Sequence, residues 1–299
     1  MDREWNRSGE IEHFEKIWNY RRPTHIQHTK EVWNERAHEW ADELKSDTLH
    51  RANSDRRVEA TVEYLRSKGL LGKTDEAIDI GCGPGRFVAQ FARTARHVVG
   101  TDLSSRMLEY GAQYAGELGL KNTSYVECDF KQADIDALGW AGRFDLVFSS
   151  ITPAISGLEG LEKILRMSRA WCFNSCFVHS EDELESKILK EVWNKSRSDG
   201  WDGHWHWFYA LFNLLWLRGY YPETTYYKER WDEKYTADRD TAKDYADRIA
   251  KDFGWNREGL EEPIYRYLSE QADENGMVDR RSERTYGWIL WDVRNKTDR

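Results

Sequence analysis

The stretch that most limits what this chain can fold into runs from residue 77 to residue 85, Ala-Ile-Asp-Ile-Gly-Cys-Gly-Pro-Gly. A short apolar strand pattern at 77–80 leads directly into closely spaced glycines, and a helical pattern follows at 86–93. Glycine adopts backbone conformations that are closed to other residues, so the backbone of such a turn can pass close beneath a ligand. The helix that follows presents free N–H groups in its first turn. This segment therefore predicts a ligand-binding turn between a strand and a helix.

Strand and helix patterns alternate along the rest of the chain. We expect strands at 77–80, 97–101, 123–128, 144–149, 172–179, 223–231 and 285–293. We expect helices at 11–20, 55–68, 86–93, 104–118, 158–169, 181–196, 207–218, 239–252 and 260–272, and a further helix with Trp33, Ala37 and Trp40 on one stripe. Strands separated by helices of this length imply right-handed crossovers and a parallel sheet that is covered on both faces.

The spacing of the glycines argues against a dinucleotide site. Such a site places its third glycine at position 86, in the pattern Gly-x-Gly-x-x-Gly, where it lets helix and strand pack closely around a pyrophosphate. This chain has Arg86 there, and its third glycine is Gly85. At the end of the next predicted strand, the carboxylate of Asp102 can accept both ribose hydroxyls of a nucleoside. The alternative role of Asp102, capping the following helix, is already filled by Ser104.

Composition limits the partners of the chain. Its 299 residues carry a net charge of −9, which disfavours a large nucleic-acid footprint because such a surface needs clustered Lys and Arg. The longest apolar stretch, at 205–217, is shorter than the roughly 20 residues that span a bilayer, and the N-terminus has no secretory pattern. The four cysteines form no CxxC pair, as is typical of reduced thiols. We therefore expect a cytoplasmic protein without nucleic-acid or membrane partners.

From about residue 57 to 180 the chain resembles the class I S-adenosylmethionine-dependent methyltransferases of the small-molecule, UbiE-like (type 11) kind. The resemblance covers the glycine turn, Asp102, the run Cys-Asp-Phe at 128–130 and the run Arg-Phe-Asp-Leu-Val-Phe-Ser at 143–149. It implies an α/β fold with a Rossmann-like, seven-stranded, mostly parallel sheet of strand order 3-2-1-4-5-7-6 whose last strand is antiparallel. To this fold the chain adds N-terminal helices and a helical insertion after the fifth strand. We expect a helical cap at 1–56 and a methyltransferase domain at 57–299, with 181–222 as the substrate-side insertion.

The resemblance also implies a cofactor site at the carboxyl ends of the first four strands, which would bind S-adenosyl-L-methionine and release S-adenosyl-L-homocysteine. Residues of the glycine turn would hold the methionine part, residues after the second strand the ribose and adenine, and residues after the third strand the adenine. A residue of the fourth strand would lie under the methionyl end. The residues of the glycine turn are Asp79, Gly81, Cys82, Gly83 and Gly85, and those after the second strand are Asp102, Leu103 and Met107. The residues after the third strand are Asp129 and Phe130, and the residue of the fourth strand is Ser149.

The acceptor side is expected in the segments outside the resemblance, which hold most of the 15 tryptophans. The helix around 33–40 resembles the aromatic-flanked helix that many small-molecule members fold over the cofactor. The substrate-side candidates are Trp33, Trp40, Trp201, Trp205 and Phe208, and the alternative is that these aromatics only pack added helices. His204 and His206 are candidate general bases because the pKa of histidine lies near neutrality, or else packing residues before a helix. Without a close spacing such as HxxxH, we expect no metal site.

Methyl transfer from a sulfonium is an in-line displacement on an activated carbon, so the enzyme chiefly aligns and desolvates the reactants. The leading prediction is a methyltransferase that acts on a small molecule. The segment after the fourth strand lacks the Asn- or Asp-Pro-Pro-aromatic motif of enzymes that methylate exocyclic amines or glutamine amides. Two alternatives stay open: a methyltransferase that acts on RNA or protein, and a non-catalytic module that binds S-adenosylmethionine.

Overall fold

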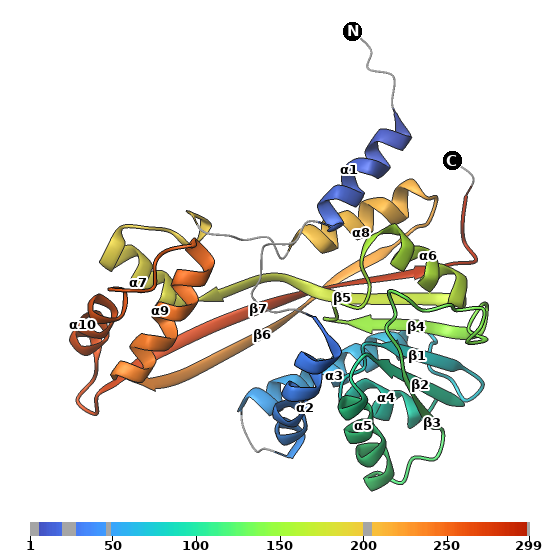
Figure 1. Ribbon diagram of the computed structural model, residues 1–299, viewed down its shortest axis with the longest axis horizontal. Coiled ribbons are helices and arrows are strands. Elements are labelled where there is room, and N and C mark those ends of the chain that lie inside the picture. The colour runs from blue at the N-terminus through green and yellow to red at the C-terminus, as the bar shows by residue number, and fades with distance from the viewer. Residues whose placement is uncertain (1–5, 20–27, 46–48, 200–204, 298–299) are drawn as a thin grey trace. The chain divides into compact units, whose positions relative to one another are not determined.

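The computed structural model describes residues 6–19, 28–45, 49–199 and 205–297 (Figure 1). Its helices are α1 (Arg7–Asn19), α2 (Lys30–Lys45), α3 (Leu49–Ser67), α4 (Arg86–Ala92), α5 (Ser105–Glu117), α6 (Gly157–Met167), α7 (Glu183–Trp193), the 3-10 helix η1 (Arg197–Asp199), α8 (Trp205–Leu217), α9 (Arg239–Phe253) and α10 (Glu261–Gln271). Its strands are β1 (Glu76–Ile80), β2 (His97–Asp102), β3 (Thr123–Glu127), β4 (Phe144–Ser150), β5 (Ser168–Asp182), β6 (Glu223–Thr236) and β7 (Met277–Asp292). Every predicted strand and helix is present, and β5, β6 and β7 are longer than predicted.

The strands form one sheet in the order β3-β2-β1-β4-β5-β7-β6, which confirms the predicted topology. β2 pairs with β1 and β3, and β4 pairs with β1 and β5, all in parallel. Figure 1 shows the arrow of β7 running opposite to that of β5, so the sheet is mixed but mostly parallel. Because parallel strands all end at one edge, the carboxyl ends of β1, β2 and β4 lie next to one another, where open α/β sheets bind ligands.

Local sequence signals explain where the helices around β1 and β2 begin and end. Ser104 has an extended backbone, and its Oγ accepts a hydrogen bond at 3.1 Å from the N–H three residues later, so α5 starts where predicted. α3 ends before Gly69, whose φ of +77° is the left-handed conformation that favours glycine. The buried side of α3 carries Val58, Val62 and Leu65 at helical spacing, as predicted.

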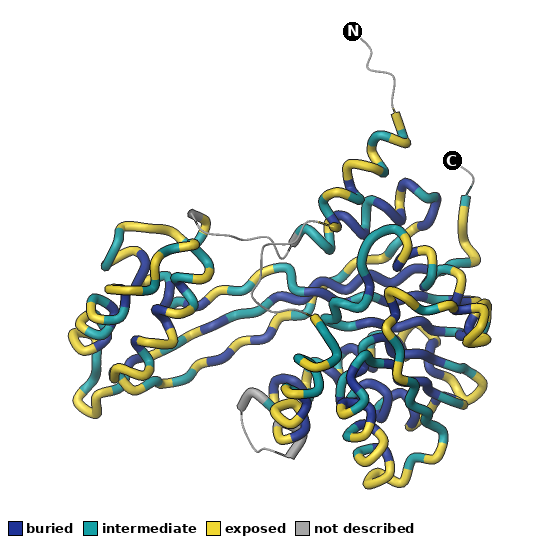
Figure 2. The backbone as a smooth tube through the Cα atoms, viewed as in Figure 1, coloured by how far each residue is buried: buried dark blue, intermediate teal, exposed yellow. Residues whose placement is uncertain are grey.

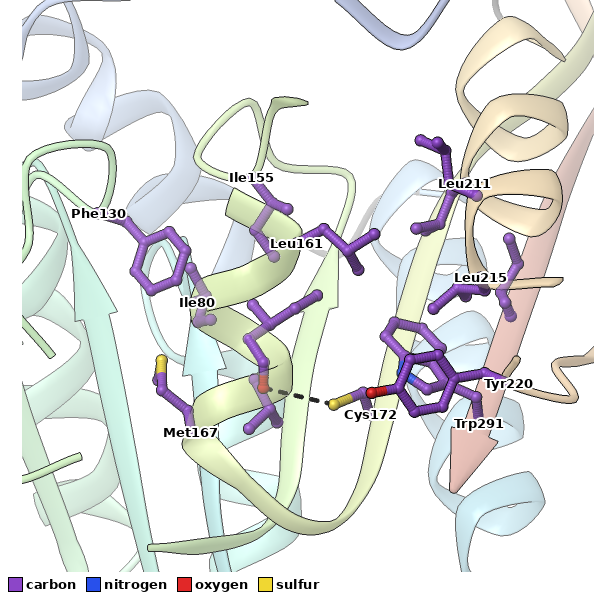
Figure 3. Packing of buried hydrophobic residues seen from close by; sticks show 14 of the residues in the cluster. Ile80, Phe130, Ile155, Leu161, Met167, Cys172, Leu211, Leu215, Tyr220 and Trp291 are labelled. Atoms are coloured by element: carbon purple, nitrogen blue, oxygen red, sulfur yellow. Dashed lines mark hydrogen bonds between the residues drawn. The ribbon is translucent and has the colours of Figure 1, made fainter. Parts of the chain in front are cut away.

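Both faces of the central strands are covered, as Figure 2 shows by the buried positions along β1, β2 and β4. On one face, side chains of the sheet pack with α1, α6 and α8 in a large apolar cluster (Figure 3). Members labelled there are Ile80, Phe130, Ile155, Leu161, Met167, Cys172, Leu211, Leu215, Tyr220 and Trp291. On the other face the rings of Phe148 and Phe173 stack 5.0 Å apart, and Phe87 of α4 lies 4.6 Å from Phe148.

The chain divides into two compact units. The first comprises 1–176, 206–227 and 287–299, and the second comprises 177–205 and 228–286. In the second unit α7, α9 and α10 pack around a core that includes Ile188, Tyr245 and Leu268. This division differs from the predicted insertion at 181–222, because α8 packs into the core of the first unit. The second unit is instead built on the far parts of β5, β6 and β7.

The N-terminal helices belong to the first unit, not to a separate cap. Phe14 and Trp18 of α1 are buried in its apolar cluster. In α2, Ala37 and Ala41 are buried, whereas Trp40 is 42% exposed. The predicted stripe is therefore wrong at Trp40, because α2 turns its small side chains inward where it packs on α5.

Candidate cofactor site

The glycine turn between β1 and α4 has the backbone geometry that its sequence predicts. Gly81, Gly83 and Gly85 have φ values of +70°, +52° and +76°, all in the left-handed region. The N–H groups of Gly81 and Cys82 donate to the carbonyl oxygen of Thr101 at 2.8 and 2.9 Å. These bonds tie the turn to the end of β2 and bring Asp102 beside it.

Two of these glycines also allow close approach by other segments. A Cβ atom at Gly85 would lie 2.8 Å from the hydroxyl oxygen of Tyr125, on β3. A Cβ atom at Gly81 would overlap Oγ1 of Thr152, in the loop after β4. At Gly83, by contrast, no atom of the described residues other than Gly83 and its two chain neighbours lies within 4 Å of that position. The backbone at Gly83 is therefore open to a ligand, while the turn on either side is held by contacts that sequence patterns do not reveal.

Asp102 is bonded to the turn through both carboxylate oxygens. Oδ2 accepts from the N–H of Gly83 at 3.0 Å, and Oδ1 accepts from the N–H of Ser104 at 2.9 Å. Burial raises the pKa of Asp102, although the N–H groups of Ser104 and Gly83 act in the opposite direction. Each carboxylate oxygen has two lone pairs and so keeps the capacity to accept a further hydrogen bond. This capacity is what the predicted ribose role requires.

Asp79, on β1, is the most exceptional ionisable group at this edge. It is 2% exposed, and in the described part of the chain no group donates a hydrogen bond to its carboxylate. Burial raises the pKa of Asp79 well above its usual range, and the neighbouring carboxylate of Asp102 adds to the rise. A buried acid without a partner, at the edge where open α/β sheets bind ligands, is a candidate to hold a cationic group of a ligand.

Arg86, the residue that departs from the dinucleotide pattern, fastens α3 to the first turn of α4. Its Nη1 donates to Oγ of Ser54 at 2.7 Å, and its Nη2 forms an ion pair with Asp55. A glycine at this position would lose both contacts. The chain thus uses an arginine for packing where a dinucleotide fold needs glycine.

Helix α2 is fastened over the start of α5, next to Asp102. Oδ1 of Asn34 accepts from Oγ of Ser104 at 2.7 Å and from the N–H of Arg106 at 3.4 Å. Lys30 of α2 also forms an ion pair with Glu127, the last residue of β3. Sequence patterns do not single out Asn34, since a polar residue in an exposed-looking helix gives no signal of its partner. α2 therefore lies beside the residues predicted to bind the ribose and adenine.

The other predicted cofactor residues occupy different surroundings. Met107 is buried and Leu103 half-buried, both next to Asp102 in the chain. Asp129 is exposed, and its Oδ1 accepts from the N–H of Lys131 at 3.1 Å. Three further residues are buried, each with structural contacts of its own. Cys82 lies in the glycine turn, and Phe130 lies in the apolar cluster of Figure 3. The third is Ser149, whose Oγ donates to the carbonyl oxygen of Phe173 at 3.3 Å and accepts from Asn174 at 2.9 Å.

The acceptor-side candidates are only partly described. Trp33 is half-buried on α2, with the ring of His28 stacked 5.7 Å away. Phe208 is half-buried, and its ring lies 5.4 Å from that of Tyr226. His206, at the start of α8, is half-buried. Trp201, His204 and the side chain of Trp205 lie outside the described residues.

None of the four thiols in the chain has the environment of an activated nucleophile. Burial raises the pKa of Cys82, Cys128 and Cys172, and it raises the pKa of Cys176 to about 12. Among the described residues, no three His, Cys, Asp or Glu side chains are grouped so that they could hold a metal ion. No helix in the described ranges is long and apolar enough to cross a membrane.

A sequence comparison identifies a known kind of domain in the chain. Residues 77–172 match the family described as "Methyltransferase domain", and this segment holds the glycine turn and Asp102. By this match, residues 77–172 form a methyltransferase domain.

Curated relatives match part of the chain. The 23S rRNA (uracil(1939)-C(5))-methyltransferase RlmD of Aeromonas hydrophila is 32% identical over 126 residues, 41% of this chain and 27% of the relative. The enzyme of that name from Klebsiella pneumoniae is 32% identical over 105 residues, 35% of this chain and 23% of the relative. The chain thus spans about a quarter of the length of these curated relatives. Their names point to RNA, contrary to our expectation of no nucleic-acid partner.

Two solved methyltransferases align with parts of this chain at low identity. The magnesium protoporphyrin IX methyltransferase of Synechocystis, with bound S-adenosylhomocysteine, aligns with a TM-score of 0.49 and 16% identity over 66% of this chain and 90% of that chain. The RNA methyltransferase of Salinibacter ruber, also with S-adenosylhomocysteine, aligns with a TM-score of 0.33 and 19% identity over 39% of this chain and 74% of that chain.

Proposed function

We propose that this chain transfers a methyl group from S-adenosylmethionine to a small-molecule acceptor. The observation that carries the proposal is the carboxyl edge of β1 and β2, where the partnerless Asp79 and the bonded Asp102 flank a turn that is open at Gly83. The residues present fit the cofactor, because an amino acid ammonium suits the buried carboxylate of Asp79 and ribose hydroxyls suit Asp102.

Each part of the site has a distinct task in this proposal. Asp79 holds the ammonium of the methionine part, and the backbone around Gly83 lies along it. Asp102 accepts the ribose hydroxyls, Leu103 and Met107 lie beside the adenine, and their position is kept by Asn34 through Ser104. Asp129, Phe130 and Ser149 keep their predicted adenine and methionyl roles as part of the proposal. The bound cofactor supplies an electrophilic methyl group on a sulfonium.

The protein's contribution to transfer is alignment and the exclusion of water. α2 and α3 are both fastened near the carboxyl edge, the first through Asn34 and the second through Arg86. All four thiols have raised pKa values, which speaks against a thiolate that first adds to the acceptor. We therefore propose direct displacement by a nucleophilic atom of the acceptor.

A small acceptor is favoured over RNA by the charges of the chain. The net charge is −9, and the exposed cations along β6 and β7 are matched by carboxylates, as in the pairs of Lys228 and Arg230 with Glu283 and of Arg281 with Asp232. Such pairing leaves little cationic surface there for phosphates. The rRNA named for the relatives is not carried over to this chain, because the alignment covers only about a quarter of each relative.

The test is to incubate the protein with methyl-labelled S-adenosylmethionine and a cell extract divided into dialysable small molecules, RNA and protein. We expect label in the dialysable fraction. Label in RNA or protein instead would refute the small-molecule acceptor while leaving methyl transfer intact. Calorimetry with S-adenosylhomocysteine and NAD separates the binding step, since we expect binding of the first and no comparable binding of the second. Cofactor binding without label in any fraction would indicate the non-catalytic module.

A further inference from the structure

A pair of hydroxyls lies where β4 ends, and the cofactor site described above does not use it. Ser150 and Ser175 are register partners in the parallel strands β4 and β5. Side chains at partner positions point to the same face of a sheet, and neighbouring strands lie about 4.8 Å apart. Two residues earlier in both strands, Phe148 and Phe173 stack on this face. On this face of the sheet, the stacked phenylalanines are therefore followed at the carboxyl edge by two neighbouring serine hydroxyls.

Neither hydroxyl has a hydrogen-bond partner among the described residues, although both Oγ atoms are buried. Ser175 is 2% exposed as a whole residue. On the opposite face, by contrast, Oγ of Ser149 is bonded to both Phe173 and Asn174. A buried hydroxyl without a partner costs stability that an apolar residue of the same size would not. A ligand that bonds to the two hydroxyls would supply the missing partners.

The hydroxyl pair lies beside the glycine turn. Ile151 follows Ser150 with a φ of +52°, and its N–H donates to the carbonyl oxygen of Ser175 at 2.8 Å. A β-branched residue in the left-handed region is strained, and such strain is typical of functional sites. The sharp turn at Ile151 brings Thr152 over Gly81. Since β4 is next to β1 and β5 is one strand further, the hydroxyls lie roughly 5 and 10 Å to the side of the β1 end.

Helix α3, which covers this face, carries a third buried group without a partner. The ring of Tyr64 lies 6.4 Å from that of Phe173, which places α3 over β5. Asn53 lies three turns earlier in α3, towards the carboxyl edge, and is 2% exposed. Its Oδ1 accepts from Arg56, while its Nδ2 has no partner among the described residues. An amide nitrogen can only donate, so the third group calls for a ligand that accepts hydrogen bonds.

We propose that Ser150 and Ser175 bind an oxygen of the methyl acceptor, a carbonyl or carboxylate oxygen that bridges the two hydroxyls. This inference rests on the proposed methyl transfer to a small molecule and names the group by which that molecule is held. One oxygen can accept from both hydroxyls, because two hydrogen bonds of about 2.7 Å span a gap of about 4.8 Å. Nδ2 of Asn53 is a further donor for the oxygens of a larger acceptor on the same face.

The test uses small aromatic probes and the full chain with S-adenosylhomocysteine bound. Saturation-transfer NMR compares benzoate and benzamide, which present an oxygen acceptor, with benzylamine, whose ammonium only donates at neutral pH. We expect the two oxygen probes to bind and benzylamine not to bind. Ser175→Ala should weaken benzoate binding about tenfold. The matched control is Ser168→Ala, because Ser168 is buried on the same strand and its Oγ donates to the carbonyl oxygen of Trp171 at 2.9 Å.

A melting curve separates a binding role from a structural one. Ser175→Ala should melt at the same or a higher temperature than the wild type, because it removes an unpartnered hydroxyl, whereas Ser168→Ala should melt lower and bind benzoate normally. Equal binding of benzoate by wild type and Ser175→Ala, equal binding of benzylamine, or no binding of either oxygen probe would overturn the inference. Failure of S-adenosylhomocysteine to bind would count against the proposed function instead, and the comparison of benzoate binding by wild type and Ser175→Ala would still decide the hydroxyl pair.

Discussion

Replacing Asp79 by Asn tests two effects of its buried carboxylate: a loss of folding stability and a gain in cofactor binding. The two side chains have nearly the same shape, so the change removes charge without opening a cavity. Burial and the carboxylate of Asp102 raise the pKa of Asp79, so the folded protein without ligand holds this proton more tightly than the unfolded chain does. The stability that the proton contributes is fully present below the unfolded pKa of about 4 and is lost as the pH rises through the folded pKa. Near pH 7.5, Asp79→Asn should therefore melt at a higher temperature than the wild type, and the difference should shrink towards pH 4.

The same substitution should weaken binding of S-adenosylhomocysteine. A hydrogen bond between an ammonium and a carboxylate contributes about 1.5–3 kcal/mol, which corresponds to a roughly 10- to 150-fold increase in Kd. The carboxylate must also lose its proton before it can hold the ammonium. Titration calorimetry in buffers of different ionisation enthalpy should therefore detect proton release on binding by the wild type and less release by Asp79→Asn.

Asp145→Asn is the matched control, because Asp145 is an aspartate of the neighbouring strand β4 with the opposite perturbation. Burial acts to raise the pKa of Asp145, but the guanidinium of Arg169 and the N–H of Glu76 bring it below its usual value. Its contribution to stability is present above the unfolded pKa and is lost as the pH falls. Asp145→Asn should therefore melt lower at neutral pH and keep its affinity for S-adenosylhomocysteine. An unchanged Kd for Asp79→Asn, or a lower melting temperature at neutral pH, would refute the role given to Asp79.

Three further substitutions test other parts of the site and fold. Asp102→Ala should leave the circular dichroism spectrum unchanged but weaken S-adenosylhomocysteine binding by about 2–3 kcal/mol in calorimetry, and an unchanged Kd would return Asp102 to a structural role. Asn34→Ala should raise the Kd several-fold and increase hydrogen exchange in α2, because α2 loses its bond to Ser104; equal exchange would show that this bond does not hold the helix. Trp18→Ala should destabilise the protein by about 3–5 kcal/mol in urea unfolding, and a loss below about 1 kcal/mol would contradict its place in the core.

The sequence by itself determined the order of the elements and the framework of the site. Periodicity is a local property, so the strands, the helices and the N-cap at Ser104 could be assigned from neighbouring residues alone. The glycine turn and Asp102 are also local signals, each at the end of a strand, and the resemblance that they carry supplied the strand order. The departure at Arg86 could be recognised from spacing, although not the contacts that Arg86 makes.

Only the tertiary structure decided which distant residues meet. The partnerless burial of Asp79, the bond between Asn34 and Ser104, and the unbonded hydroxyls of Ser150 and Ser175 depend on segments that no local pattern connects. The sequence predicts α8 as part of the insertion at 181–222, whereas α8 packs in the core of the first unit. Long-range contacts decide where α8 packs, and no local pattern reveals them. Trp40 was misplaced for the same reason, since small alanines let two helices approach more closely than a tryptophan allows. Local periodicity predicts which residues share a face of a helix or strand, but the contacts between elements determine which face is buried.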